Sequence, residues 1–139
     1  LHGVVRSVDL CVARGIRRFL LLSSWNAGDP MRGPREDRRH YYAAKHAADR
    51  ILVCSGLEHT IVRPGRLTDD DPCGRVRIGT DLERPGEIPR ADLATVMATC
   101  LVQPATVGAT FEVVTGDDRI ATAVTRSVPD GVSAGEGRT

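Results

Sequence analysis

Short, unbroken apolar runs alternate along this chain with longer segments whose apolar residues recur at helical spacing. The runs Phe19–Leu22 and Thr60–Arg63 are too short for a helix and are typical of strands buried on both faces. Between them, Glu36 to Ser55 has the pattern of an amphipathic helix, and Gly56 provides its stop. Strands separated by helices in this way predict right-handed crossovers and a parallel sheet with helices on both faces, which is an α/β fold.

The rest of the chain continues this alternation of predicted helices and strands. Apolar residues from Val4 to Val12 predict a first helix, which Gly15 ends. After Thr60–Arg63, a polar stretch from Arg66 to Pro89 is too long for a plain connection and is typical of a binding segment or lid. We further expect the following elements: a short alternating stretch at Arg75–Ile78, a helix at Ala91–Val102, a strand at Thr110–Val114, a turn at Gly116–Asp117 and a last helix near Arg119–Arg126.

Bulk properties exclude several classes of protein. The 139 residues have the length of one domain, and 19 basic against 18 acidic side chains do not indicate a nucleic-acid partner. The cluster Arg32, Arg35, Arg38 and Arg39 is diluted by neighbouring acids and is interpreted as a solvated helix start, with a phosphate-contacting patch as the alternative. No apolar run is long enough for a membrane span or a signal-peptide core. The four cysteines are widely spaced, as in reduced intracellular thiols, which predicts a cytoplasmic location.

The polar residues that follow the expected strands converge on one edge of the sheet. Ser24, Arg63 and Gly65 lie at the carboxyl ends of strands, and Tyr41 lies near the start of the intervening helix. Open α/β sheets bind ligands at this edge. Trp25, directly after Ser24, is predicted either to wall a substrate pocket or to cap the core.

Tyr41 and Lys45 form the strongest candidate pair. Lys45 is the single lysine beside 18 arginines, and it lies four residues after Tyr41. On a helix both side chains face the same way, and a nearby ammonium stabilises phenolate, so the phenol becomes a better proton donor and acceptor. A hydroxyl such as that of Ser24 could donate to the same substrate oxygen. The alternative is an ordinary amphipathic helix pair beside a strand end.

No metal site is expected. Asp69, Asp70 and Asp71 with Cys73 lack ligand spacing, because three adjacent carboxylates point in different directions. The four histidines show no ligand pattern either, and His40 is expected at the surface although it adjoins the proposed site.

Several blocks, in the correct order, resemble the atypical short-chain dehydrogenase/reductases. The nearest branch is the NAD(P)-binding group similar to NAD-dependent epimerase/dehydratases and NmrA-like proteins. The resemblance covers about Leu1 to Arg126 and rests on these blocks: Phe19–Ser24, His40-Tyr41-x-x-x-Lys45 with Ala47–Asp49, Gly56-Leu57 before Thr60–Gly65, Arg90–Ala94 and Gly108-x-x-Phe111-Glu112.

The resemblance implies a Rossmann-like fold that binds NAD or NADP. By the family pattern, Tyr41 would be the proton donor or acceptor, Lys45 would bind the nicotinamide ribose, and Ser24 would orient a small carbonyl or hydroxyl substrate. Ser23 is a second candidate for the hydroxyl, and Arg63-Pro64-Gly65 would lie along the nicotinamide.

One family element is missing from the sequence. The first strand and Gly-rich phosphate turn have no counterpart, so residues 1–128 look like the carboxyl-terminal two-thirds of one domain, which would leave the edge of the Phe19–Leu22 strand unpaired. Residues 129–139 are expected to be a disordered tail. We predict an NAD(P)-dependent oxidoreductase or epimerase-like enzyme. The alternatives are a redox-sensing module that binds the dinucleotide without turnover, and an inactive truncated fragment.

Overall fold

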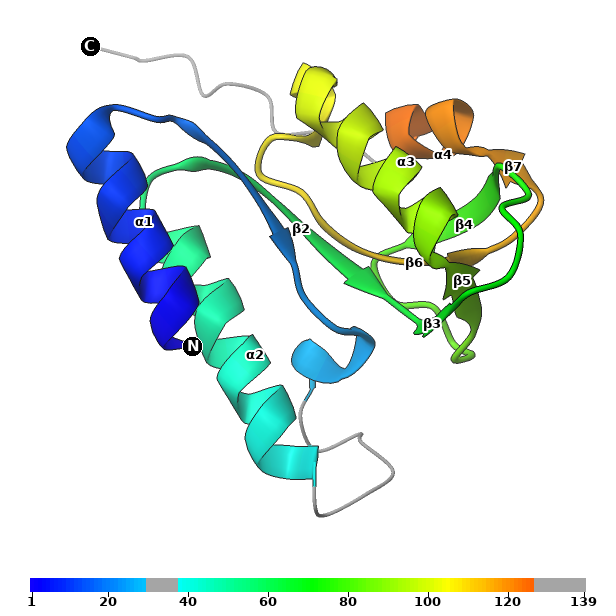
Figure 1. Ribbon diagram of the computed structural model, residues 1–139, viewed down its shortest axis with the longest axis horizontal. Coiled ribbons are helices and arrows are strands. Elements are labelled where there is room, and N and C mark those ends of the chain that lie inside the picture. Colours follow the sequence, from blue (N-terminus) through cyan, green and yellow to red (C-terminus); the bar gives the residue numbers. More distant parts are fainter. Residues whose placement is uncertain (30–37, 127–139) are drawn as a thin grey trace, which may run out of the picture.

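The protein has three layers, with a central sheet between two pairs of helices (Figure 1). The computed structural model describes residues 1–29 and 38–126. The expected helix start at Glu36, two arginines of the basic cluster (Arg32 and Arg35) and the expected tail at 129–139 lie outside the described residues.

The central sheet is mostly parallel and has the strand order β1-β2-β6-β4-β7. The strands β1 (Arg18–Leu22), β2 (Glu58–Pro64) and β6 (Thr110–Thr115) run parallel to one another. The expectation of a parallel sheet is therefore confirmed for its central part. It is wrong for β4 (Arg75–Gly79) and β7 (Asp118–Arg119), which extend the sheet in antiparallel pairings.

Helices cover both faces of the sheet, as expected for this fold class. The helices α1 (His2–Arg14) and α2 (Arg39–Cys54) lie on one face, while α3 (Arg90–Val102) and α4 (Ile120–Arg126) lie on the other (Figure 1). Gly15 ends α1 in the left-handed conformation with φ of 68°, which glycine adopts without steric cost. Two short 3-10 helices complete the described chain, η1 (Trp25–Ala27) and η4 (Pro104–Thr106).

Alternate residues of the strands pack against opposite helix layers. Leu21 and Ile61 join the cluster that contains Val8 of α1 and Leu52 of α2. The next residue of β2, Val62, belongs instead to the cluster formed with α3 and α4. The strand β1 is less buried than its continuous apolar run predicts, since Leu22 is 40% exposed. It is an edge strand that pairs only with β2 within the described ranges, as expected from the sequence.

A buried polar network ties β1 and β2 to the end of α3. Arg18 donates to the hydroxyls of Thr60 (2.7 Å) and Thr106 (2.9 Å) and to the carbonyl oxygen of Cys100 (2.9 Å). A cation is favourable there because the carbonyls at a helix carboxyl end carry partial negative charge. Burial lowers the pKa of the Arg18 guanidinium. Burial also raises the pKa of the Cys100 thiol to about 11, against a smaller opposing effect of Arg18.

The polar stretch between Arg66 and Pro89 contains two more short strands. The strands β3 (Arg66–Thr68) and β5 (Glu87–Pro89) form a separate two-stranded parallel sheet. The chain passes from the central sheet into this pair at Gly65, whose backbone lies against Gly86: a Cβ added at Gly65 would be 2.2 Å from the Gly86 carbonyl oxygen. This close approach explains why glycine follows Pro64.

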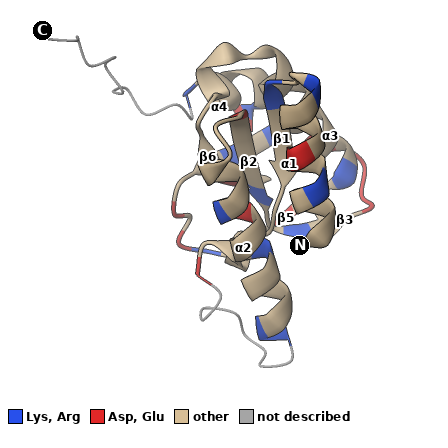
Figure 2. Cartoon of the chain, turned by 90° about the vertical axis from the view of Figure 1, so that its left-hand side faces the viewer, with Lys and Arg blue, Asp and Glu red and all other residues tan. Residues whose placement is uncertain are grey.

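The described surface carries charges of both signs. Basic and acidic positions are interspersed on the side of the molecule shown in Figure 2. Across residues 1–29 and 38–126, no helix is both long and apolar enough to cross a bilayer. All four cysteines carry free thiols.

Candidate functional site

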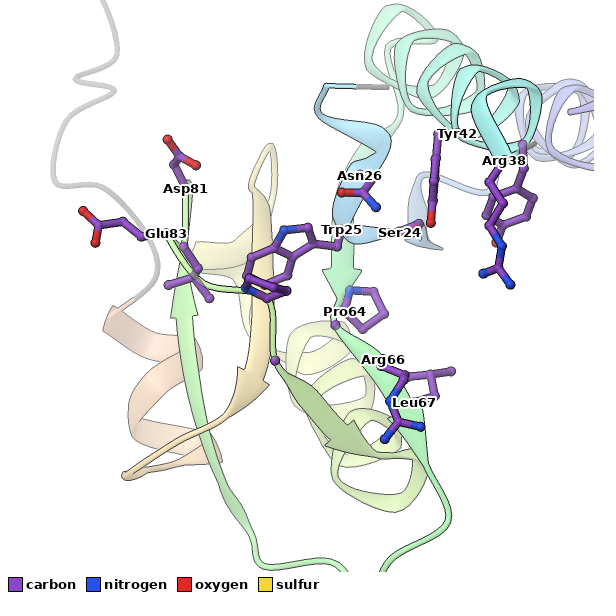
Figure 3. A pocket seen from close by; sticks show the side chains of 15 residues that line it. Ser24, Trp25, Asn26, Arg38, Tyr42, Pro64, Arg66, Leu67, Asp81 and Glu83 are labelled. Carbon is purple, nitrogen blue, oxygen red and sulfur yellow. The ribbon is translucent and has the colours of Figure 1, made fainter. Parts of the chain in front are cut away.

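A cleft of about 1250 Å³ lies at the carboxyl ends of β1 and β2 (Figure 3). It is lined by Ser24–Asn26 and the start of α2, by residues 64–67, and by the 81–86 segment, which forms its far wall. This is the edge at which parallel α/β sheets bind ligands. Of the candidates identified in the sequence, the cleft brings together Ser24, Tyr41, Pro64 and Gly65.

Tyr41 and Lys45 lie on the same side of α2. The Lys45 Nζ atom is 5.8 Å from the centroid of the Tyr41 ring and 3.3 Å from the Leu22 carbonyl oxygen, to which it donates. Lys45 therefore links α2 to the carboxyl end of β1. Tyr41 lines the cleft and is 54% exposed, so a bound molecule can contact its side chain.

The two serines that follow β1 have different environments. Ser24 lines the cleft as the residue that precedes η1. Ser23 is buried, and its backbone N–H donates to the Val62 carbonyl oxygen at 2.8 Å. The Ser23 Oγ atom has no hydrogen-bond partner among the described residues. Ser24 is therefore the hydroxyl that a substrate can reach, whereas Ser23 is a buried polar group next to the Lys45 contact.

Arg63 is engaged within the protein. Its Nε and Nη2 atoms donate to Oδ2 of Asp49 at 3.0 and 2.9 Å. The two side chains are 17% and 3% exposed, so this ion pair is largely shielded from water. Arg63 does not line the large cleft but a neighbouring cavity of about 320 Å³. The ion pair between Arg63 and Asp49 connects α2, which carries Tyr41 and Lys45, to the strand that ends at Pro64.

The far wall of the cleft is held by a buried carboxylate. Glu112 on β6 is 8% exposed and accepts a hydrogen bond from the backbone N–H of Leu82 at 2.7 Å. The backbone N–H of Arg66 donates to the Gly86 carbonyl oxygen at 2.9 Å at the other end of this wall. Glu112 lies in one of the sequence blocks that resemble the family, but its sequence position alone does not indicate this contact.

The structure adds residues to the site that sequence reasoning did not assign. Tyr42 is 9% exposed and packs edge-to-face on Tyr41, with ring centroids 5.4 Å apart. Trp25 lines both cavities, which favours its role as a pocket wall over that of a core cap. Arg38 and Arg66 also line the cleft. Arg38 was identified only as part of a basic helix start.

Acidic residues near the two-stranded sheet make contacts within the protein. No group of three or more potential ligands is placed to hold a metal ion within the described residues. Asp69 instead pairs with Arg90 at 2.9 Å. The backbone N–H groups of Cys73 and Gly74 donate to the buried carboxylate of Asp92, each at 2.9 Å.

A mostly parallel sheet covered by helices on both faces, with a cleft beyond its strand ends, is the architecture of Rossmann-like nucleotide-binding proteins. A family model described as NAD(P)H-binding matches residues 2–104. The chain belongs to this NAD(P)H-binding family, which confirms the resemblance noted in the sequence.

Related proteins and solved structures give the same result. An uncharacterised sugar epimerase from Bacillus subtilis is 37% identical over 124 residues, which are 89% of this chain and 57% of that protein. A putative NAD-dependent epimerase/dehydratase from Bacillus halodurans superposes with a TM-score of 0.87 at 39% identity, over 91% of this chain and 59% of that chain. An oxidoreductase from Lactococcus lactis superposes with a TM-score of 0.81 at 25% identity, over 91% of this chain and 58% of that chain. The chain thus spans a little over half the length of these relatives.

Proposed function

We propose that the protein is an NAD(P)-dependent oxidoreductase or epimerase-like enzyme in which Tyr41 transfers a proton to or from a carbonyl or hydroxyl substrate. The observation that carries the proposal is the shared orientation of Tyr41 and Lys45, whose ammonium lies 5.8 Å from the phenol ring. Membership of the NAD(P)H-binding family and likeness to epimerase and oxidoreductase structures support the reaction class.

Residues in and beside the cleft would hold the dinucleotide, although Lys45 and Ser23 do not line the cleft itself. An ammonium has three donors, and Lys45 directs one of them to the Leu22 carbonyl oxygen, which leaves two for the hydroxyls of a ribose. Ser23 Oγ has no hydrogen-bond partner among the described residues, and because it is enclosed it would meet a polar group of the cofactor only if its side chain turned toward the bound molecule. Pro64 and Gly65 would lie along the nicotinamide, and Arg63 supports this edge through Asp49. When bound, the nicotinamide would supply or accept the hydride.

The roles of the chain's own groups follow from their positions. Ser24 would donate a hydrogen bond to the substrate oxygen and hold it near the Tyr41 hydroxyl. Tyr41 would give that oxygen a proton during reduction, or remove one during oxidation. The Lys45 ammonium would stabilise the negative charge left on the phenol oxygen. Trp25 and Tyr42 would exclude water from one side of the substrate.

The test uses two neighbouring tyrosines in the intact protein. Tyr41→Phe removes the proton-transferring oxygen and should lower turnover across a panel of carbonyl compounds by about 10²- to 10⁴-fold. Its affinity for NAD(P)H should remain nearly unchanged. Tyr42→Phe is the matched control, since it removes a hydroxyl from the adjacent ring, and it should retain turnover within a few-fold. Full activity of Tyr41→Phe, or loss of activity only in Tyr42→Phe, would contradict the proposal.

The same measurements separate the alternatives. Dinucleotide affinity without turnover of any carbonyl compound would favour a redox-sensing module. If the intact protein binds NAD(P)H and the 139-residue chain does not, the phosphate contacts lie outside this chain and the chain alone is an inactive fragment.

A further inference from the structure

We propose that the cleft takes a substrate that carries an anionic group, a carboxylate or a phosphate, attached to a flat or apolar body. The inference rests on the proposed function, because it concerns the substrate end of the same cleft. Its evidence is different, since it uses neither Lys45 nor the cofactor edge.

Two guanidinium groups from separate elements lie on one side of the cleft. Figure 3 shows Arg38, at the start of α2, and Arg66, at the start of β3, on the same side. Arg38 has no carboxylate partner within the described ranges. Arg66 directs both its Nε and Nη2 atoms to a single oxygen of Glu87, which leaves the Nη1 donors for another acceptor. Guanidinium groups bind carboxylates and phosphates through such paired donors.

The acidic side chains of the cleft are separated from these arginines. Asp81 and Glu83 lie on the opposite side, with their carboxylates turned outward in Figure 3. Asp81 also has an interaction partner of its own. An anion on the arginine side would therefore meet two donor groups without a facing carboxylate from the opposite wall.

The space between the charged sides is lined by aromatic and apolar side chains. Trp25, Tyr42, Pro64 and Leu67 all contribute to it. Tyr42 is 9% exposed, so its ring is held in place by packing. Flat rings bind well against such surfaces because they bury apolar area and stack.

Helix geometry sets the length of the predicted substrate. Arg38 is three residues before Tyr41 and four before Tyr42, so the Arg38 and Tyr41 side chains leave the backbone about one helical turn, roughly 5 Å, apart. A substrate whose anionic group and carbonyl are separated by a single aromatic ring matches this spacing.

The test compares ketones that differ only in charge, with the intact protein and NAD(P)H. The probes are 4-acetylbenzoate, its neutral methyl ester and 4-acetylphenyl phosphate. Binding is measured separately with benzoate, phenyl phosphate and neutral methyl benzoate, through quenching of Trp25, the single tryptophan of the chain. The variants are Arg38→Gln and Arg66→Gln. Arg17→Gln is the control, because Arg17 is also exposed and, like Arg66, paired with a glutamate (Glu58), but it lies before β1, at the other end of the strand.

An anionic probe should be favoured over its neutral analogue by about tenfold, which corresponds to one hydrogen bond to a charged group. Arg38→Gln should abolish most of this preference, Arg66→Gln should reduce it, and Arg17→Gln should leave it intact. A preference for carboxylate or for phosphate identifies the anion, and either supports the proposal. Failure of benzoate and phenyl phosphate to bind, equal response to neutral and anionic probes, or a preference unchanged in both cleft variants would overturn it.

The two proposals fail in different ways. Arginine-dependent binding of anions without turnover would leave this inference standing and remove the proposed reaction. Equal turnover of the neutral and anionic probes would support the proposed reaction and contradict this inference.

Discussion

The ion pair between Arg63 and Asp49 offers a quantitative test of how the site is supported. Asp49 is buried, its Oδ2 atom accepts both hydrogen bonds from Arg63, and its Oδ1 atom has no partner among the described residues. Replacing Arg63 by methionine would keep the apolar stem and remove the cation that pairs with this carboxylate. The carboxylate would then be a buried charge without compensation.

The magnitude follows from that burial. Removing one partner of a buried pair costs about 3–5 kcal/mol, and we expect the lower end, about 3 kcal/mol, because Arg63 is 17% exposed. For a domain of this size, that loss lowers Tm by roughly 10 °C. The double variant Arg63→Met with Asp49→Leu removes both charges and should cost about 1 kcal/mol or less, which is below either single variant.

Urea and thermal unfolding of the four proteins would measure this cycle. The control is Arg90→Met, whose partner Asp69 is 88% exposed and whose removal should cost less than about 1 kcal/mol. If Arg63→Met costs no more than Arg90→Met, or if the double variant is the least stable of the set, the reasoning is refuted.

Three further predictions concern the supporting structure. Gly65→Ala places a Cβ 2.2 Å from the Gly86 carbonyl oxygen and should lower the free energy of unfolding by about 2–3 kcal/mol, measured by urea unfolding; an unchanged value would contradict the close approach. Glu112→Ala removes the acceptor of the Leu82 N–H, so amide exchange at Leu82 should accelerate about tenfold and substrate KM should rise while NAD(P)H affinity stays constant; protected exchange at Leu82 would argue against this anchor. Burial raises the pKa of Cys100 from 9.0 to about 11, so the folded state holds this proton more tightly than the unfolded state does. The free energy of unfolding should therefore be constant below pH 9 and fall by about 1.4 kcal/mol per pH unit between pH 9 and 11. This fall should be absent in Cys100→Ala, and its persistence there would contradict the assignment.

The sequence was informative wherever structure depends on neighbours along the chain. The apolar runs in β1 and β2 identified the parallel core, because unbroken hydrophobic strands need cover on both faces. The antiparallel direction of β4 was not predicted, although its sequence pattern is consistent with it. Val76 is buried between the exposed Arg75 and Arg77, and such alternation is common in antiparallel strands. That alternation indicates an antiparallel strand, which is how β4 pairs with β6 and β7.

In the candidate site, too, contacts between neighbours along the chain were predictable and contacts between distant residues were not. Tyr41 and Lys45 were identifiable because four-residue spacing on a helix fixes their relative orientation. The engagement of Arg63 by Asp49 was not, since the two residues are 14 positions apart and meet only when α2 packs on β2. The basic side of the cleft likewise depends on Arg38 and Arg66 arriving from different elements, which no local pattern specifies.

The most direct test of the account is the chemical reactivity of Lys45. It is the single lysine of this chain, so peptide mapping by mass spectrometry after limited acetylation reports its accessibility without ambiguity. Because two of its ammonium donors are predicted to bind the nicotinamide ribose, saturating NAD(P)H should slow its acetylation at least several-fold, while acetylation elsewhere in the intact protein stays constant. Equal rates with and without bound dinucleotide would show that Lys45 does not bind the cofactor and would contradict the proposed site.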